Sequence, residues 1–165
     1  MNELNLNSPL GFFREIAHKN VTDFYRIHQS TASIDKAQAV QVYRYLVNAC
    51  LTINHVTDKV ADELSYQKGS LLIPHIKTIY PDEGQALDIV RLYSNELKHN
   101  ARDSHQLCLR DKGQSDHWDA PPQLLAWSFT NRQGLTFEIV ENLMSTWVFW
   151  GKYFSGERSL LVMKV

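Results

Sequence analysis

A long apolar repeat in the first half of the chain restricts the fold more than any other feature of the sequence. It begins near Asp35, whose carboxylate forms a helix-capping pattern with Gln38, and apolar residues then recur every three or four positions. About 30 residues at 1.5 Å each would make a helix of roughly 45 Å, which we expect to be the central helix of the fold. Its apolar positions are Ala39, Val42, Leu46, Ala49, Cys50, Ile53, Val56, Val60 and Leu64.

Three further helices are predicted around this one. Ser8 and Pro9 are typical of a helix start, and a helix is expected over residues 9–29 with Leu10 on its apolar side. Residues 85–103 and 139–154 carry the same spacing, and Gly156 is a plausible stop for the last helix. Residues 65–84 contain Gly69, Pro74 and Pro81, so they are predicted to be a connection with a short apolar insert.

A small β-hairpin is predicted before the last helix. Two apolar runs, residues 124–129 and 135–137, flank the turn sequence of residues 131–134. Residues 104–122 are polar and rich in turn residues, which predicts a long exposed connection, and residues 160–165 are compatible with an edge strand. The expected fold is therefore mainly α: one domain over residues 1–165, built as an antiparallel four-helix bundle with a long second helix and a hairpin.

Composition excludes several classes of protein. The chain has 165 residues with 44% hydrophobic and 21% charged residues, as ordinary globular domains do. Its net charge of -1 argues against a surface that binds nucleic acid over its whole area. No signal peptide and no apolar run of membrane-spanning length are seen, and Cys50 and Cys108 form no disulfide framework. We therefore expect a cytoplasmic protein that does not interact with membranes.

Polar residues form a stripe along the third predicted helix. Arg91, Asn95, His99 and Arg102 follow one another at spacings of four, four and three residues, which places them on one side of a helix. Such a stripe usually faces water. The second helix, however, carries polar residues within its apolar stretch, so a buried network between the two helices is the alternative reading. These residues are Asn54, His55 and Asp58.

The segment from Leu92 to His99 resembles the Arg-Asn-x-x-x-His element of HEPN domains. These are helical bundles that occur as RNases in toxin–antitoxin and phage-defence systems and as non-catalytic binding modules. The pattern Asn54-His55-x-x-Asp58 on the preceding helix is similar to what bundles of this kind carry. The resemblance covers two helices closely and the four-helix organisation loosely.

The resemblance implies roles for the residues of the stripe. His99 would act as general acid and base on the RNA 2′-hydroxyl, and Asn95 would orient it or a phosphate. The position of the family's arginine, which is taken to stabilise phosphate charge, is occupied by Ser94 in this chain. Arg91, one turn before, or Arg102, one turn after, would have to replace it.

Two other patterns of charged residues and histidines are present. Arg110-Asp111 followed by His117 fits the family's spacing, but so loose a pattern is expected by chance and lies in a predicted loop. The pairs Glu15-x-x-His18 and Glu96-x-x-His99 resemble those of carboxylate-bridged di-iron bundles. Further carboxylates that such a site would use are Asp58 or Asp62, and Glu138 or Glu141.

The leading hypothesis is a HEPN-like bundle of a toxin–antitoxin or defence system that cleaves or binds RNA. If it is an enzyme, we expect an endoribonuclease that needs neither metal nor another cofactor. The alternative is a non-enzymatic interaction module, in which the same stripe is structural or contacts a protein partner. A third possibility is a bundle that binds metal through its Glu-x-x-His pairs. A homodimer is expected, because in this family the sites meet across a two-fold interface.

Overall fold

The structure, a computed structural model, describes residues 5–30, 36–98, 107–109, 125–131 and 133–160. The chain is mainly helical and carries a small antiparallel sheet. In chain order the elements are α1 (Pro9–Phe12), η1 (Phe13–Ala17), α2 (His18–Ser30), α3 (Lys36–Glu63), α4 (Gly69–Ile79), α5 (Pro81–Lys98), β1 (Leu107–Leu109), β2 (Leu125–Thr130), β3 (Thr136–Glu138) and α6 (Ile139–Phe154).

The first predicted helix is confirmed, although it contains a wider turn. The Ser8 hydroxyl accepts the Gly11 N–H at 3.0 Å, and Pro9 occupies the first helical position. The π-helical η1 then separates α1 from α2. The sequence placed Leu10 on the apolar side, and this was wrong: Leu10 is 42% exposed, whereas Pro9 is buried. Because the wider turn follows Leu10, the register of the buried face of α2 does not extend back to it.

The long second helix is also confirmed. It runs over 28 residues as α3, and most of the predicted apolar positions are fully buried. Val40, which lies off this buried stripe, is 52% exposed. The buried apolar positions are Val42, Leu46, Ala49, Cys50, Ile53, Val56, Val60 and Ala61.

The prediction of a connection between residues 65 and 84 was wrong, because a helix, α4, forms there. Its first residue, Gly69, donates its N–H to the Asp58 carboxylate of α3 at 3.1 Å. Leu72 and Ile76, one turn apart, are fully buried and supply the apolar side of α4. Pro81 begins α5, earlier than the predicted start at 85, because proline suits a first helical position where no N–H bond is needed.

The hairpin before the last helix is confirmed. β2 pairs with β3 in antiparallel register, with Phe129 opposite Phe137. The Glu138 side chain caps α6 by accepting the Glu141 N–H at 2.6 Å. Gly156, with φ +84°, follows the end of α6 as the sequence suggested.

A third strand changes the prediction for residues 104–122. β1 lies within that segment and pairs with β2 in antiparallel register, so it is not all loop. The rest of the predicted connection lies outside the described residues, as do residues 161–165 of the suggested edge strand.

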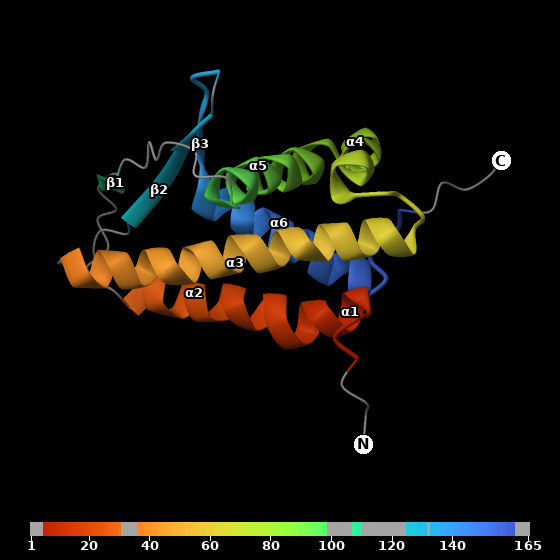
Figure 1. Ribbon diagram of the computed structural model, residues 1–165, viewed down its shortest axis with the longest axis horizontal. Coiled ribbons are helices and arrows are strands. Elements are labelled where there is room, and N and C mark those ends of the chain that lie inside the picture. Colours follow the sequence, from red (N-terminus) through yellow and green to blue (C-terminus); the bar gives the residue numbers. More distant parts are fainter. Residues whose placement is uncertain (1–4, 31–35, 99–106, 110–124, 132, 161–165) are drawn as a thin grey trace, which may run out of the picture.

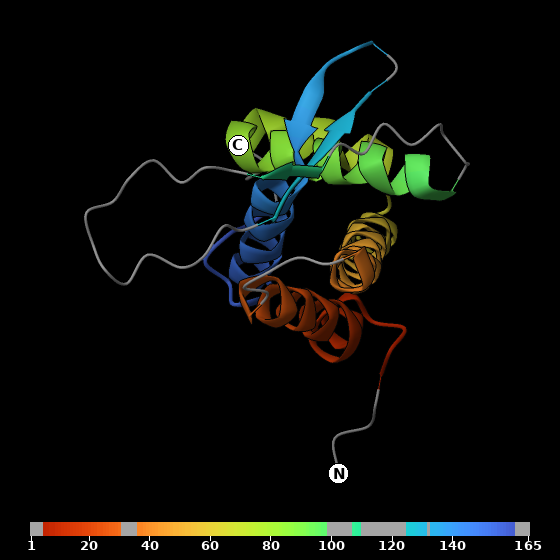
Figure 2. The same ribbon diagram turned by 90° about the vertical axis from the view of Figure 1, so that its left-hand side faces the viewer.

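The helices pack in layers. α2 lies along α3, α3 packs on α5, and α5 packs on α6 and α4 (Figure 1). Viewed from the end, α3 and α6 both lie between α2 on one side and α4 with α5 on the other (Figure 2). The β2–β3 hairpin projects beyond the helices in both views. The largest fully buried side chains between the layers are Trp150, Tyr93, Phe24 and Phe149.

In the part of the chain that the structure describes, no helix has both the length and the apolar character needed to cross a membrane.

Candidate functional site

Ser94, at the position of the family's arginine, is part of the protein interior. Its side chain is completely buried, and its hydroxyl donates to the Cys50 carbonyl oxygen of α3 at 3.1 Å. Burial also raises the pKa of the Cys50 thiol well above its usual range, so this cysteine stays neutral beside the bond. The sequence pattern indicated a gap in a catalytic motif, whereas the structure shows a buried contact between α3 and α5.

Of the polar residues of α3, Asp58 has a partner other than the one expected. A network between Asn54 and Asp58 on one side and Asn95 and His99 on the other was the alternative reading of the sequence. Asp58 instead accepts the Gly69 N–H, and Asn54 is 5% exposed. No hydrogen bond joins Asn54 to Asn95 within the described residues, and His99 lies outside them.

His55 lies at the surface between aromatic and charged neighbours. Its ring makes an edge contact with Phe12 at 5.0 Å, and its Nδ1 atom is 3.9 Å from the Asp58 carboxylate. Burial lowers the pKa of His55 below its usual value; Asp58 opposes this shift, and the charges of Lys59 and Lys98 add to it. The charge of Lys98, at the end of α5, therefore acts on a side chain of α3.

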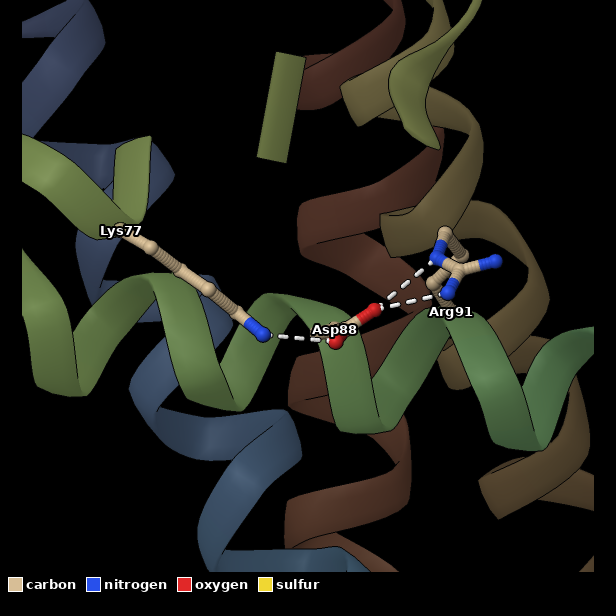
Figure 3. A network of polar contacts seen from close by, with 3 residues as sticks. All are labelled: Lys77, Asp88 and Arg91. Atoms are coloured by element: carbon tan, nitrogen blue, oxygen red, sulfur yellow. Dashed lines mark hydrogen bonds and ion pairs between the residues drawn. The ribbon is translucent and has the colours of Figure 1, made fainter. Parts of the chain in front are cut away.

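Arg91 is held by Asp88 of its own helix, and Asp88 also binds Lys77 of α4. Its Nη2 and Nε atoms donate to the Asp88 Oδ1 atom at 2.8 and 3.1 Å, and the Lys77 ammonium donates to Oδ2 at 2.7 Å (Figure 3). Burial raises the pKa of Asp88, but the hydrogen bonds and positive charges of Lys77 and Arg91 outweigh it and hold this pKa below its usual value. The guanidinium of Arg91 is therefore already matched by a carboxylate.

Asn95 and Lys98 complete the surface on which the sequence placed the candidate site. Asn95 is half-buried and Lys98 is exposed, both near the end of α5. The other two residues of the predicted stripe, His99 and Arg102, lie outside the described residues. We call the surface formed by His55 and Asp58 of α3 with Arg91, Asn95 and Lys98 of α5 the α3–α5 face; Asn54 lies buried beneath it.

The residues of the metal hypothesis have other contacts. The Glu15 carboxylate forms an ion pair with Lys19 at 2.8 Å, which lowers the pKa of Glu15. The Nδ1 atom of His18 accepts the indole N–H of Trp147 at 3.1 Å, which links α2 to α6. Among the described residues, no group of three histidine, cysteine or acidic side chains could hold a metal ion. The other pair of this hypothesis is Glu96 and His99, and His99 lies outside the described residues.

The loop pattern of Arg110, Asp111 and His117 also lies outside the described residues, and of Cys108 the structure describes only the backbone, in β1.

The sequence patterns did not indicate a group of polar contacts between the segment that follows α6 and the start of α5. The Arg158 guanidinium lies over the Tyr80 ring at 4.7 Å and donates to the Glu83 carboxylate at 3.0 Å. The Tyr80 hydroxyl in turn donates to the Ser159 carbonyl oxygen at 3.2 Å. These residues are far apart in the sequence, so no local pattern could have indicated the contact.

Comparison with known proteins identified no relative. No known protein family, no curated protein and no solved structure matches the chain. The assignment of a function therefore depends on the geometry alone.

Proposed function

We propose that the protein is a HEPN-like module of a toxin–antitoxin or defence system that binds a protein partner through the α3–α5 face and does not cleave RNA. One observation carries this proposal: Ser94 occupies the position of the family's arginine and is fully buried, with its hydroxyl on the Cys50 carbonyl. A position that joins two helices in the core cannot present a charge to a phosphate.

The geometry of Arg91 supports the same proposal. A replacement for the missing arginine would need a guanidinium whose charge is available to a substrate. The Asp88 carboxylate accepts hydrogen bonds from both Nη2 and Nε of Arg91, and it also accepts one from Lys77. Freeing Arg91 would leave Asp88 with one partner fewer in a site where only 22% of its side chain is exposed.

The proposal includes a cytoplasmic homodimer of four-helix bundles. The four-helix arrangement is supported by contacts of α2 with α3, of α3 with α5 and of α5 with α6. The hydrogen bond between Trp147 and His18 joins α6 to α2. Val40 is exposed off the buried stripe of α3, so it is available to a second copy. We expect the wild-type protein to sediment as a dimer and a Val40→Asp variant to sediment as a monomer.

RNA cleavage is the second candidate, and one observation favours it. Asn95 is half-buried and Lys98 is exposed at the end of α5, directly before His99. In this reading His99 is the general acid and base, Asn95 orients it, and Arg102 supplies the positive charge.

Incubation with a pool of cellular RNA separates the two candidates. Wild-type protein, His99→Ala and the surface control Arg26→Ala would each be tested with and without EDTA. We expect no cleavage by any of them. Cleavage by wild type and Arg26→Ala that is lost in His99→Ala would overturn the binding proposal, and loss with EDTA alone would support the metal hypothesis.

Photo-crosslinking in the cells that make the protein tests the binding surface. A photoreactive residue would replace Lys98 on the α3–α5 face or, as control, Leu71 on α4, which is also exposed. We expect a defined protein adduct from position 98 that is absent from position 71. Equal adducts at both positions would argue against the α3–α5 face.

A further inference from the structure

A second surface, on the other end of α5, is hollowed. We call it the α5–α6 groove; its volume is about 440 Å³. This is within the range of sites that bind ligands or side chains, roughly 300–1,000 Å³. Two residues of the first turn of α5 form one wall, and the outward side of α6 forms the other. The lining residues are Asp82, Glu83, Met144, Ser145, Val148, Phe149 and Lys152.

The α6 wall carries a short apolar strip, formed by Met144 and Val148, and Lys152 follows it one turn later. Met144, Val148 and Lys152 are four residues apart, so their side chains follow one another along one side of the helix over roughly 12 Å. Val148 is 46% exposed, and Phe149, which is 1% exposed, closes the groove against the core. Methionine adapts its shape readily, which suits a surface that receives another side chain.

Two of the three charged groups on the rim, Asp82 and Lys152, have no ion-pair partner among the described residues. Asp82 and Glu83 suit the start of α5, because acidic groups stabilise a helix N-terminus. Glu83 is bonded to Arg158, whereas neither Asp82 nor Lys152 has an ion-pair partner in the described part of the chain. The groove therefore offers an exposed carboxylate, an apolar strip and an ammonium group.

We propose that the α5–α6 groove binds a short helical segment of a partner protein. Its apolar residues, spaced four apart, would cover Met144 and Val148. A lysine or arginine would lie opposite Asp82, and an acidic residue opposite Lys152. A helix fits this arrangement because residues four apart on one helix match a strip of residues four apart on another. The proposal is independent of the function proposed above, because the groove shares no residue with the α3–α5 face.

Defined synthetic peptides test the groove. Two helical peptides of about 15 residues would carry the same leucines four apart. One has lysine at one end of the strip and glutamate at the other; the second has glutamate at both ends. Binding to the full chain is measured by fluorescence anisotropy. The mixed peptide should bind about fivefold more tightly than the acidic one, as a surface ion pair allows.

Three variants locate the binding. Val148→Asp should weaken binding of the mixed peptide at least about tenfold, because a charge would replace the apolar side chain that the peptide covers. Leu71→Asp, at a position on α4 that is 45% exposed, is the matched control and should bind as wild type does. Asp82→Lys should reverse the preference toward the acidic peptide. Circular dichroism confirms that each variant is folded.

The proposal is overturned if neither peptide binds at concentrations up to about 1 mM. It is equally overturned if Val148→Asp and Leu71→Asp weaken binding to the same extent, or if Asp82→Lys leaves the preference unchanged. Each of these results would mean that the apolar strip and its charges do not act together.

Discussion

The two halves of α5 use polar side chains in different ways. In the first half, Glu83 is bonded to Arg158, and Asp88 is bonded to Lys77 and Arg91. In the second half, Lys98 is exposed, and no hydrogen bond or ion pair of its side chain is seen within the described residues. Glu83 and Asp88 in the first half of the helix thus stabilise the fold, whereas Lys98 at its end is available to a partner.

The difference follows from what lies beside each half. α4 packs against the first half so closely that a side chain at Gly84 would begin 2.7 Å from the Lys77 backbone. This approach brings the Lys77 ammonium within reach of Asp88. In the second half, Ser94 is the side chain that bonds to α3, and it does so in the core. A polar residue is therefore structural where a neighbouring helix brings a partner to it.

The largest expected effect comes from introducing an arginine at position 94, where the HEPN pattern has one. Ser94→Arg would place an unpaired charge where the side chain is completely buried, which should lower the free energy of unfolding by about 3 kcal/mol or more. Urea denaturation measures this. Ser94→Ala removes only the hydroxyl and should cost about 1 kcal/mol. A folded Ser94→Arg protein of unchanged stability would show that this half of α5 can open.

Gly84→Ala tests the close approach of α4. Its new Cβ would lie 2.7 Å from the Cα and N atoms of Lys77, so the helices must separate, at an expected cost of about 1–3 kcal/mol in thermal or urea unfolding. Gly151→Ala is the matched control, since nothing lies within 4 Å of the new atom. It should stabilise the protein by about 0.5–1 kcal/mol, because alanine favours a helix. Equal effects of the two changes would contradict this account of the first half.

The ion pairs of Asp88 predict a dependence of stability on pH. The pKa of Asp88 in the folded protein lies below the ordinary value of 3.8. Its contribution is therefore fully present above about pH 5 and is lost as the pH falls through the folded-state pKa. Asp88→Asn should lower the free energy of unfolding by about 1–2 kcal/mol at neutral pH. Below the ordinary pKa of an aspartate, this free energy should fall less steeply with pH than that of the wild type. If stability falls at low pH in this variant as steeply as in the wild type, carboxylates other than Asp88 cause the fall.

Asn95→Ala should have the smallest effect on stability. Because no hydrogen bond of the Asn95 side chain is seen among the described residues, the free energy of unfolding should change by no more than about 0.5 kcal/mol. The crosslinking yield at position 98 should nevertheless fall if the α3–α5 face binds a partner. A large loss of stability would place Asn95 with the structural residues of the first half.

Much of the fold could be predicted because its signals are local. Ser8 and Pro9 start the first helix, Glu138 lies at the start of α6, and Gly156 follows its end. Caps and apolar spacing involve residues within one or two turns of each other, so they are readable from the sequence. The helix α4 was missed because Gly69 and Pro74 are read as helix breakers, whereas the acceptor for the Gly69 N–H is supplied by Asp58 of another helix.

The candidate site could be predicted only in part. The four-residue spacing correctly placed Arg91 and Asn95 on α5 and Asn54 and Asp58 on α3. It could not indicate that the Asp88 carboxylate, which accepts a hydrogen bond from Arg91, also accepts one from Lys77 of α4.

Sequence information alone was enough to identify the long central helix, the helix beginning at Pro9 and the hairpin, because the forces that produce them act between neighbours in the chain. The use of each polar residue was decided by tertiary structure. Ser94 meets the Cys50 carbonyl 44 residues away, and Glu83 meets Arg158 75 residues away. Whether such a group becomes a contact of the core or a binding surface depends on which distant segment packs against it.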